Sequence, residues 1–278
     1  MKGAFLLEEI KRGIIVIKNM KNWEDYFFNS LGLIQRKLIT LKMKNKLVYI
    51  IRTKTLDKYL FAETVLEDQY LLNQINFDKN SVIIDLGAQI GFFSVFASRK
   101  AEKIFAFEPV TENFELLKKN IKLNKLENKI FPFNLAVSDK KGKEKIFLSE
   151  TNTGSHSIYG FKEPEQEKGS SINYFLNGKG FSKKNFVEVS SITLDEIFTA
   201  NKINQCDLLK IDIEGAEYNV LYNLSDSCFK KIHRIVMEVH DIDEKKNNLA
   251  YLMKFLESKG FKVKINNAVL FAERNQKN

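Results

Sequence analysis

Cysteine, proline and histidine are scarce in this chain of 278 residues, which contains 2, 3 and 3 of them. Cys206 and Cys228 have neither CxxC nor Cys/His metal spacing, so a disulfide framework and a zinc site have no support. No apolar run approaches the ~20 residues that a bilayer span needs, and the first residues lack the features of a signal peptide. We therefore expect an unexported, cytoplasmic protein.

The positive charge of the chain is concentrated near its N-terminus. The formal net charge is +9, and residues 1–54 hold 12 Lys/Arg against 4 Asp/Glu, which leaves a net charge of +1 for the other 224 residues. A nearly neutral core disfavours a broad basic groove along a nucleic-acid backbone. The basic segment fits a solvated lysine-rich surface, or a contact with an acidic glycan, a lipid headgroup or a nucleic acid.

Residues 1–75 form an N-terminal extension in our interpretation. Apolar residues at helical spacing within residues 22–41 predict an amphipathic helix. A strand over 47–52 and a helix over 55–66 follow. The apolar face of the predicted helix would pack on the core or on a second subunit of a homo-oligomer, which is the more common use. A peripheral contact with a membrane surface is the alternative.

Strands and helices then alternate regularly, in a core that we place at residues 76–278. The expected strands cover 82–85, 103–107, 130–137, 207–211 and 232–239, and the expected helices 92–99, 112–123, a segment from 216, and 245–259. This alternation predicts an α/β, Rossmann-like fold with a mainly parallel seven-stranded sheet. Residues 261–265 and 268–272 flank Asn266-Asn267 and predict an antiparallel pair at the C-terminal edge. A loop insertion around 154–186 lacks periodicity, and long loops are often functional.

The first strand of the core runs into a glycine turn that points to a nucleotide-like ligand. The turn reads Asp85-Leu86-Gly87-Ala88-Gln89-Ile90-Gly91, and its glycines let the backbone approach a ligand closely. The GxxxG spacing departs from the GxGxxG of dinucleotide sites and fits a methyl donor better. Glu108 ends the next strand, 21 residues after Gly87, where a carboxylate can accept two hydrogen bonds from a ribose diol. Asn134, after the third strand, is either an adenine contact or an ordinary turn residue.

Acidic residues and one histidine follow the last two parallel strands. Period-two alternation places Asp212 with Glu214 on one strand, and Glu238 with His240 on its neighbour, at the edge where open α/β sheets bind ligands. His240 is the first candidate for a base because its unperturbed pKa lies near the operating pH. His156, in a GSHS loop, is the second candidate, and His233 begins a strand and is structural in our interpretation. A divalent metal held by these oxygen and imidazole groups is a less favoured alternative.

The chain resembles the FkbM-type methyltransferases from about residue 47 to 272, in motifs that occur in the family's order: DLGAQIGFFSVFAS, FEP, NLAVSD, GSHS, TLDE, DLLKIDIEGAEYNVL and MEVH. The resemblance implies S-adenosylmethionine as cofactor, and O-methylation of a hydroxyl, often on a sugar or a secondary metabolite. The family commonly has Asn where this chain has Gln89, which keeps the amide. The expected donor-binding residues are Asp85, Gly87, Ala88, Gln89, Gly91, Phe92, Glu108, Pro109, Asn134, Ala136 and Asp212. The expected catalytic residues are His240, Asp212 and Glu214.

These patterns favour an O-methyltransferase that acts on a sugar or glycan precursor, such as a surface polysaccharide unit or its nucleotide- or lipid-linked form. Methylation of nucleic acid is disfavoured, because the chain's prolines, Pro109, Pro132 and Pro164, cannot form the Asn/Asp-Pro-Pro-aromatic motif of base methyltransferases. A secondary-metabolite methyltransferase and a scaffold without turnover are further alternatives. A dehydrogenase is the least favoured, since GxGxxG is missing.

Overall fold

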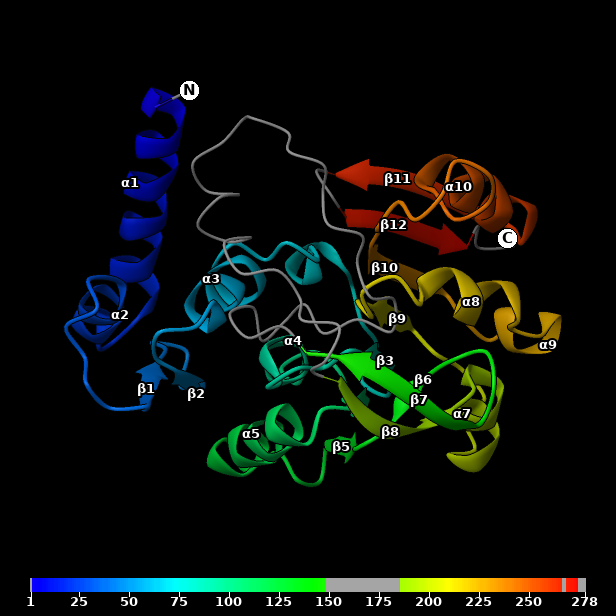
Figure 1. Ribbon diagram of the computed structural model, residues 1–278, viewed down its shortest axis with the longest axis horizontal. Coiled ribbons are helices and arrows are strands. Elements are labelled where there is room, and N and C mark those ends of the chain that lie inside the picture. The colour runs from blue at the N-terminus through cyan, green and yellow to red at the C-terminus, as the bar shows by residue number, and fades with distance from the viewer. Residues whose placement is uncertain (1, 149–185, 267–268, 275–278) are drawn as a thin grey trace.

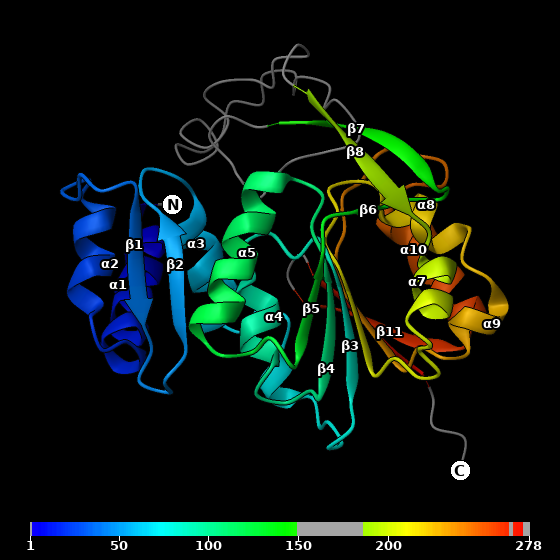
Figure 2. The same cartoon turned by 90° about the horizontal axis from the view of Figure 1, so that it is seen from below.

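The computed structural model describes residues 2–148, 186–266 and 269–274, with the backbone alone for residues 2–8. A central sheet is covered by helices on both faces, and a smaller N-terminal unit lies beside it (Figures 1 and 2). The helices of the described residues are α1 Lys2–Asn19, α2 Trp23–Ser30, α3 Asp57–Phe61, the π-helix η1 Ala62–Leu66, the 3₁₀ helix η2 Leu72–Gln74, α4 Phe92–Ala97, α5 Thr111–Leu123, α7 Leu194–Ala200, α8 Glu217–Tyr222, α9 Asp226–Phe229 and α10 Leu249–Ser258. The strands are β1 Leu38–Lys42, β2 Val48–Arg52, β3 Val82–Leu86, β4 Lys103–Phe107, β5 Ile130–Phe133, β6 Ala136–Val137, β7 Gly142–Phe147, β8 Phe186–Ile192, β9 Leu208–Ile211, β10 Arg234–Glu238, β11 Phe261–Asn266 and β12 Val269–Arg274.

The main sheet has seven strands in the order β11-β12-β10-β9-β3-β4-β5. The pairs from β10 to β5 are parallel, and β12 is antiparallel to both β10 and β11. This arrangement confirms the predicted α/β fold with a mainly parallel sheet and an antiparallel C-terminal edge. Because β3 is central and parallel, both of its faces are buried, which explains its run of apolar residues.

Two hydrophobic cores lie on opposite faces of the sheet. Alternate residues of β3 show the division: Ile83 packs with α4, α5 and the N-terminal unit, whereas Ile84 packs with α7, α8 and α10. Figure 2 shows the two sets of helices on either side of the strands. Helices thus cover both faces of the sheet, and the carboxyl ends of its parallel strands lie along one edge.

The N-terminal unit is joined to the core through side-chain amides of α5. The amide of Asn120 accepts from Ile50 N–H and donates to Ile50 C=O, and Asn124 does the same with Val48. These side-chain amides pair with the backbone N–H and C=O groups at the free edge of β2, as a further strand would. Asn120 also donates to the carbonyl oxygen of Ile90, at 2.8 Å, so the same residue contacts the glycine turn.

The predicted helix over 22–41 is wrong beyond residue 30. Gly32 has φ of +70° and Leu33 N–H donates to Phe28 C=O over 2.9 Å, which is the Schellman ending of α2. Leu38 then begins β1, in which burial alternates with period two. The strand expected over 47–52 and the helix over 55–66 correspond to β2 and to α3 followed by η1. Helix α1 had no counterpart among our expectations.

The strand expected over 130–137 is divided between two sheets. Its first part is β5, and Ala136–Val137 pairs with β8 in a three-stranded sheet of order β6-β8-β7. Between residues 138 and 206, where we expected no strand or helix, the described residues contain β7, β8 and α7, and α7 begins with a Thr193/Glu196 capping box. The loop insertion around 154–186 lies outside the described residues apart from Phe186. Within the described ranges, no helix is long and apolar enough to cross a membrane.

Candidate active site

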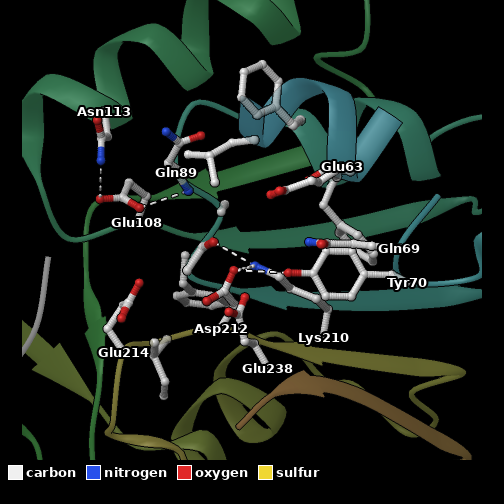
Figure 3. A pocket seen from close by; sticks show the side chains of 18 of the residues that line it. Glu63, Gln69, Tyr70, Gln89, Glu108, Asn113, Lys210, Asp212, Glu214 and Glu238 are labelled. Atoms are coloured by element: carbon white, nitrogen blue, oxygen red, sulfur yellow. Dashed lines mark hydrogen bonds and ion pairs between the residues drawn. The ribbon is translucent and has the colours of Figure 1, made fainter. Parts of the chain in front are cut away.

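A cavity of about 560 Å³ lies at the carboxyl ends of the parallel strands (Figure 3). One part of its wall comes from the segments that follow β3, β4, β9 and β10. The other part comes from residues 60–71, which belong to the N-terminal extension. This is the edge at which open α/β sheets bind ligands. The extension is therefore a component of the site.

The glycine turn between β3 and α4 forms the floor of the cavity beside Asp212. Gly87 has φ of +78°, and a Cβ at this position would overlap the backbone carbonyl oxygen of Asp212. Gly91 has φ of +94°, and its Cβ would lie 2.6 Å from Leu117 Cδ1. Glycine is therefore required at Gly87, where the clash is with backbone, and favoured at Gly91 by its positive φ. The predicted donor-binding residues Gly87, Ala88, Gln89 and Phe92 line the cavity, whereas Gly91 precedes α4 outside the lining.

Glu108 faces the glycine turn from the end of β4. Its Oε2 accepts from Gln89 N–H and its Oε1 from Val110 N–H, both over 2.9 Å. Burial raises the pKa of Glu108 to about 7, although these hydrogen bonds oppose the shift. Oε1 also accepts from Asn113 Nδ2 over 3.5 Å, so Oε2, with one protein donor, keeps a lone pair for a ligand in the cavity that Glu108 lines.

Asn134 supports the turn after β4 instead of lining the cavity. Its Nδ2 donates to the carbonyl oxygens of Glu108 and Pro109, each over 2.9 Å. Pro109 and Ala136, also predicted as donor contacts, do line the cavity. The proposed contact of Asn134 with adenine stays a prediction, while its bonds to Glu108 and Pro109 are structural.

Lys210 is a buried cation at the centre of the site that the sequence analysis did not single out. Its Nζ lies 3.3 Å from Asp85 Oδ1 and 3.5 Å from Asp212 Oδ2. It also donates to Gly87 C=O over 2.8 Å. Burial lowers the pKa of Lys210, but the two carboxylates outweigh this effect and raise it. Asp85, predicted at the donor site, is thus fully buried behind the cavity and holds Lys210.

Tyr70 completes this cluster from the N-terminal extension. Its hydroxyl donates to Asp212 Oδ2 over 3.0 Å, across 142 residues of sequence. Figure 3 shows Tyr70, Lys210 and Asp212 meeting on one side of the cavity. No local sequence signal marks Tyr70, whereas a lysine inside an otherwise apolar buried strand was a detectable signal for Lys210.

His240 is surrounded by carboxylates. Its Nδ1 lies 3.2 Å from Glu217 Oε1, and its Nε2 lies 3.5 Å from Glu214 Oε2 and 3.9 Å from Glu238 Oε1. Glu214 and Glu238 line the cavity, and His240 lies behind them. Sequence reasoning brought Glu214, Glu238 and His240 together but missed Glu217, which is fully buried at the start of α8.

The charges of this cluster change which of its members can accept a proton. Burial lowers the pKa of His240, but the hydrogen bond to Glu217 and the charge of Glu214 outweigh it and raise the pKa to about 10. The charge of Asp212, together with burial, raises the pKa of Glu238 to about 7. Burial raises the pKa of Glu214 to about 8. At neutral pH the imidazole is therefore protonated, and the carboxylates are near their titration range.

The lining of the cavity is strongly acidic. Lys210 is the only lysine or arginine among the described residues that line it. The acidic lining residues are Glu63, Glu67, Asp68, Glu108, Asp212, Glu214 and Glu238. Figure 3 shows Glu63 and Gln69 directed toward the cavity from the N-terminal extension. Such a wall favours cationic and hydroxylated ligands over phosphorylated ones.

The remaining candidates lie away from this site. His156 is outside the described residues. His233 precedes β10 at the opposite end of the strands, where its Nδ1 lies 3.6 Å from Asp207 Oδ1. Among the residues that the structure describes, no three His, Cys, Asp or Glu side chains are arranged to hold a metal ion.

Comparisons with known proteins give the following matches. The methyltransferase FkbM domain matches residues 85–263, well over half of the chain. The 31-O-demethyl-FK506 methyltransferase FkbM of Streptomyces tacrolimicus is 26% identical over 230 residues, covering 77% of this chain and 85% of the relative. The hexuronic acid methyltransferase AglP of Haloferax volcanii is 21% identical over 164 residues, covering 59% and 57%. The crystal structure of Methanocaldococcus jannaschii Trm5 in complex with adenosine aligns with a TM-score of 0.43 and 16% identity, covering 88% of this chain and 57% of that one.

Proposed function

Because the chain belongs to the FkbM family of S-adenosylmethionine-dependent methyltransferases, we propose that it methylates a hydroxyl group of a sugar or glycan precursor. The observation that carries this proposal is the acidic cavity beside the glycine turn, with carboxylates on the wall opposite Glu108. The name of one relative, a 31-O-demethyl-FK506 methyltransferase, supports methylation of an oxygen, and the name of another, a hexuronic acid methyltransferase, supports a sugar as acceptor, although that sugar carries a carboxylate that the acidic wall disfavours.

The residues at the glycine turn fit the methyl donor. A Cβ at Gly87 would fill the space beside Asp212, and Glu108 Oε2 keeps a lone pair for a ribose hydroxyl. Ala88, Gln89, Phe92, Pro109 and Ala136 complete this part of the wall. Bound S-adenosylmethionine supplies a methyl group on a sulfonium, so the acceptor oxygen needs orientation and the removal of its proton.

We assign the removal of that proton to the carboxylate of Glu238. Glu238 lines the cavity, and its pKa of about 7 makes it a carboxylate that can accept a proton near neutral pH. His240, our first candidate from the sequence, lies behind the wall and is already protonated at that pH. In this assignment His240 is a positioning residue that holds Glu214 and Glu238, and Glu217 fixes its ring. The catalytic roles of Asp212 and Glu214, and donor binding by Asp212, stay predictions.

The charge of the wall guides the choice of acceptor. A phosphate or carboxylate next to the reacting hydroxyl would face Glu63, Glu238 and Asp212, and the one lysine of the described lining, Lys210, already has Asp85 and Asp212 as partners. The same argument disfavours a nucleic-acid backbone in the cavity. The acceptor unit is therefore an uncharged or amino-bearing sugar, and any phosphate of a nucleotide or lipid carrier lies outside the cavity.

The experiment is a methyl-transfer assay with isotope-labelled donor. The purified chain is incubated with methyl-labelled S-adenosylmethionine and with sugar nucleotides that carry neutral, amino or uronic acid sugars, and labelled products are identified by mass spectrometry. We expect label on a sugar oxygen of a neutral or amino sugar, and a Glu238→Gln variant should lose it. Glu115→Gln, on the exposed face of α5, is the matched control. Label on nitrogen, or on nucleic acid offered in parallel, would refute the proposal.

A further inference from the structure

Helix α1 exposes a stripe of isoleucines. Ile10, Ile14 and Ile17 follow one another at intervals of four and three residues, so they lie on one face of the helix. Their exposed fractions are 52%, 61% and 48%. The next helix and the turn after it expose Phe28, Leu31 and Leu33 as well. Large apolar side chains gathered in this way mark an interaction surface.

The opposite side of α1 is held against the wall of the cavity. Arg12 projects about 200° around the helix from Ile10, since each residue turns the helix by about 100°. Its Nε donates to Glu67 Oε1 over 2.6 Å, and Glu67 lines the cavity. Val16 and Met20 are fully buried in the core of the N-terminal unit. The exposed stripe is thus attached rigidly to the active site.

The charges beside the stripe indicate the partner. Lys11 and Lys18 are exposed and lie seven residues apart, along one flank of the isoleucines. Lys21 is exposed directly after the helix, and residues 1–54 carry a net charge of +8, from 12 basic and 4 acidic residues. Apolar side chains flanked by lysines are the pattern of a helix that lies in the interface of an anionic bilayer.

We propose that α1 docks the protein on the surface of a bilayer that contains anionic lipids, with the isoleucine stripe in the acyl boundary and Lys11 and Lys18 at the headgroups. A second copy of the chain fits this face less well. A two-fold interface would place the basic segment of one subunit against the same segment of the other. Docking through α1 keeps the cavity, which Arg12 and Glu67 connect to this helix, near the membrane surface.

The test is co-sedimentation of the full chain with vesicles of phosphatidylcholine alone or with added phosphatidylglycerol. We expect binding to the mixed vesicles that weakens as salt increases, because the lysine contribution is screened. The triple variant Ile10→Gln/Ile14→Gln/Ile17→Gln should bind at least about tenfold more weakly, and Lys11→Gln/Lys18→Gln roughly tenfold more weakly. Leu123→Gln, which removes an exposed apolar residue of α5, is the matched control and should bind like the unaltered chain.

Titration with S-adenosylmethionine shows that each variant is folded, and sedimentation velocity gives its oligomeric state. The vesicle assay needs no acceptor, so its result is independent of the proposed sugar methylation. Absence of binding by the unaltered chain, or equal binding by the isoleucine variant and the control, overturns the proposal. So does a dimer that the isoleucine variant converts to a monomer in the absence of vesicle binding, which would assign the stripe to a second copy.

Discussion

The ammonium group of Lys210 donates a hydrogen bond to the backbone carbonyl oxygen of Gly87 over 2.8 Å. The two residues belong to neighbouring segments of the sheet edge, β9 and the turn after β3. The same ammonium faces Asp85 and Asp212, and its side chain is 3% exposed. One buried cation therefore links the glycine turn to the acidic residue at the end of β9.

Replacing Lys210 should unfold the protein more easily and weaken donor binding. Lys210→Met keeps the length of the side chain but leaves two carboxylates without their counter-ion. We expect the free energy of unfolding to fall by about 3–5 kcal/mol, measured by urea denaturation. Adding Asp85→Asn should restore part of the loss, since it removes one uncompensated charge. A loss below about 1 kcal/mol, the value of an exposed pair, would contradict this role.

Gly87→Ala separates steric overlap from backbone strain when it is compared with Gly32→Ala. Both glycines have positive φ, +78° and +70°, but a Cβ on Gly32 meets nothing within 4 Å. Gly32→Ala should therefore cost about 1–2 kcal/mol of strain and leave donor affinity unchanged. Gly87→Ala must also displace Asp212, so affinity for S-adenosylmethionine in a calorimetric titration should fall at least tenfold. Equal affinity in the two variants would show that Asp212 tolerates displacement.

The sheet was predictable because its signals are local. Parallel strands buried on both faces are continuous apolar runs, and their spacing by helices fixes the fold class. The secondary structure of the N-terminal unit was harder to predict, because the apolar residues from 22 to 41 fit helical spacing although the helix ends at Gly32. The positive φ of Gly32 ends helix α2, and the spacing of apolar residues does not predict such a backbone conformation.

In the candidate site, too, the sequence predicted the residues with a local signal and missed those that depend on tertiary contacts. Gly87, Glu108, Asp212 and Glu238 follow strand ends, and the topology of a parallel sheet brings strand ends together. Tyr70 reaches Asp212 from the extension, a tertiary contact that no local pattern reports. The raised pKa of His240 also had no local signal, because it depends on Glu217, whose Oε1 lies 3.2 Å from His240 Nδ1. Residue type predicted His240 as the base, and the carboxylates around it raise its pKa and remove it from that role.

Donor binding should depend on pH through Glu108. Its pKa of about 7 in the folded chain lies above the ordinary value of 4.5, so the carboxylate forms as the pH rises through 7. Ribose hydroxyls donate to the carboxylate, and affinity for S-adenosylmethionine should increase over that range and then level off. Glu108→Gln places an amide N–H opposite Gln89 N–H or Val110 N–H, and should weaken binding at every pH. Calorimetry at pH 6 and pH 8 checks this, and a pH-independent affinity would contradict it.

The pH dependence of turnover should distinguish Glu238 from His240 as the base. Glu238 accepts a proton only as a carboxylate, so kcat/KM for the acceptor, measured with saturating donor at every pH, should rise with pH up to about 7 and then level off. A base with the pKa of His240 would instead make the rate rise toward pH 10. Glu238→Gln should reduce kcat about 100-fold or more.

His240→Gln is the discriminating variant. The imidazolium lowers the pKa of Glu238, so its removal should move the acidic limb of the kcat/KM profile to higher pH while activity above the limb persists. Complete loss of activity at all pH values, with donor affinity retained, would return the role of base to His240. The charge of Glu238 contributes to the raised pKa of Glu214, so activity that persists in the Glu238→Gln variant, with an acidic limb below pH 8, would assign the proton to Glu214. The two variants thus separate three candidate bases, which the pH profile of the unaltered chain does not, because Glu214 and Glu238 titrate as a coupled pair.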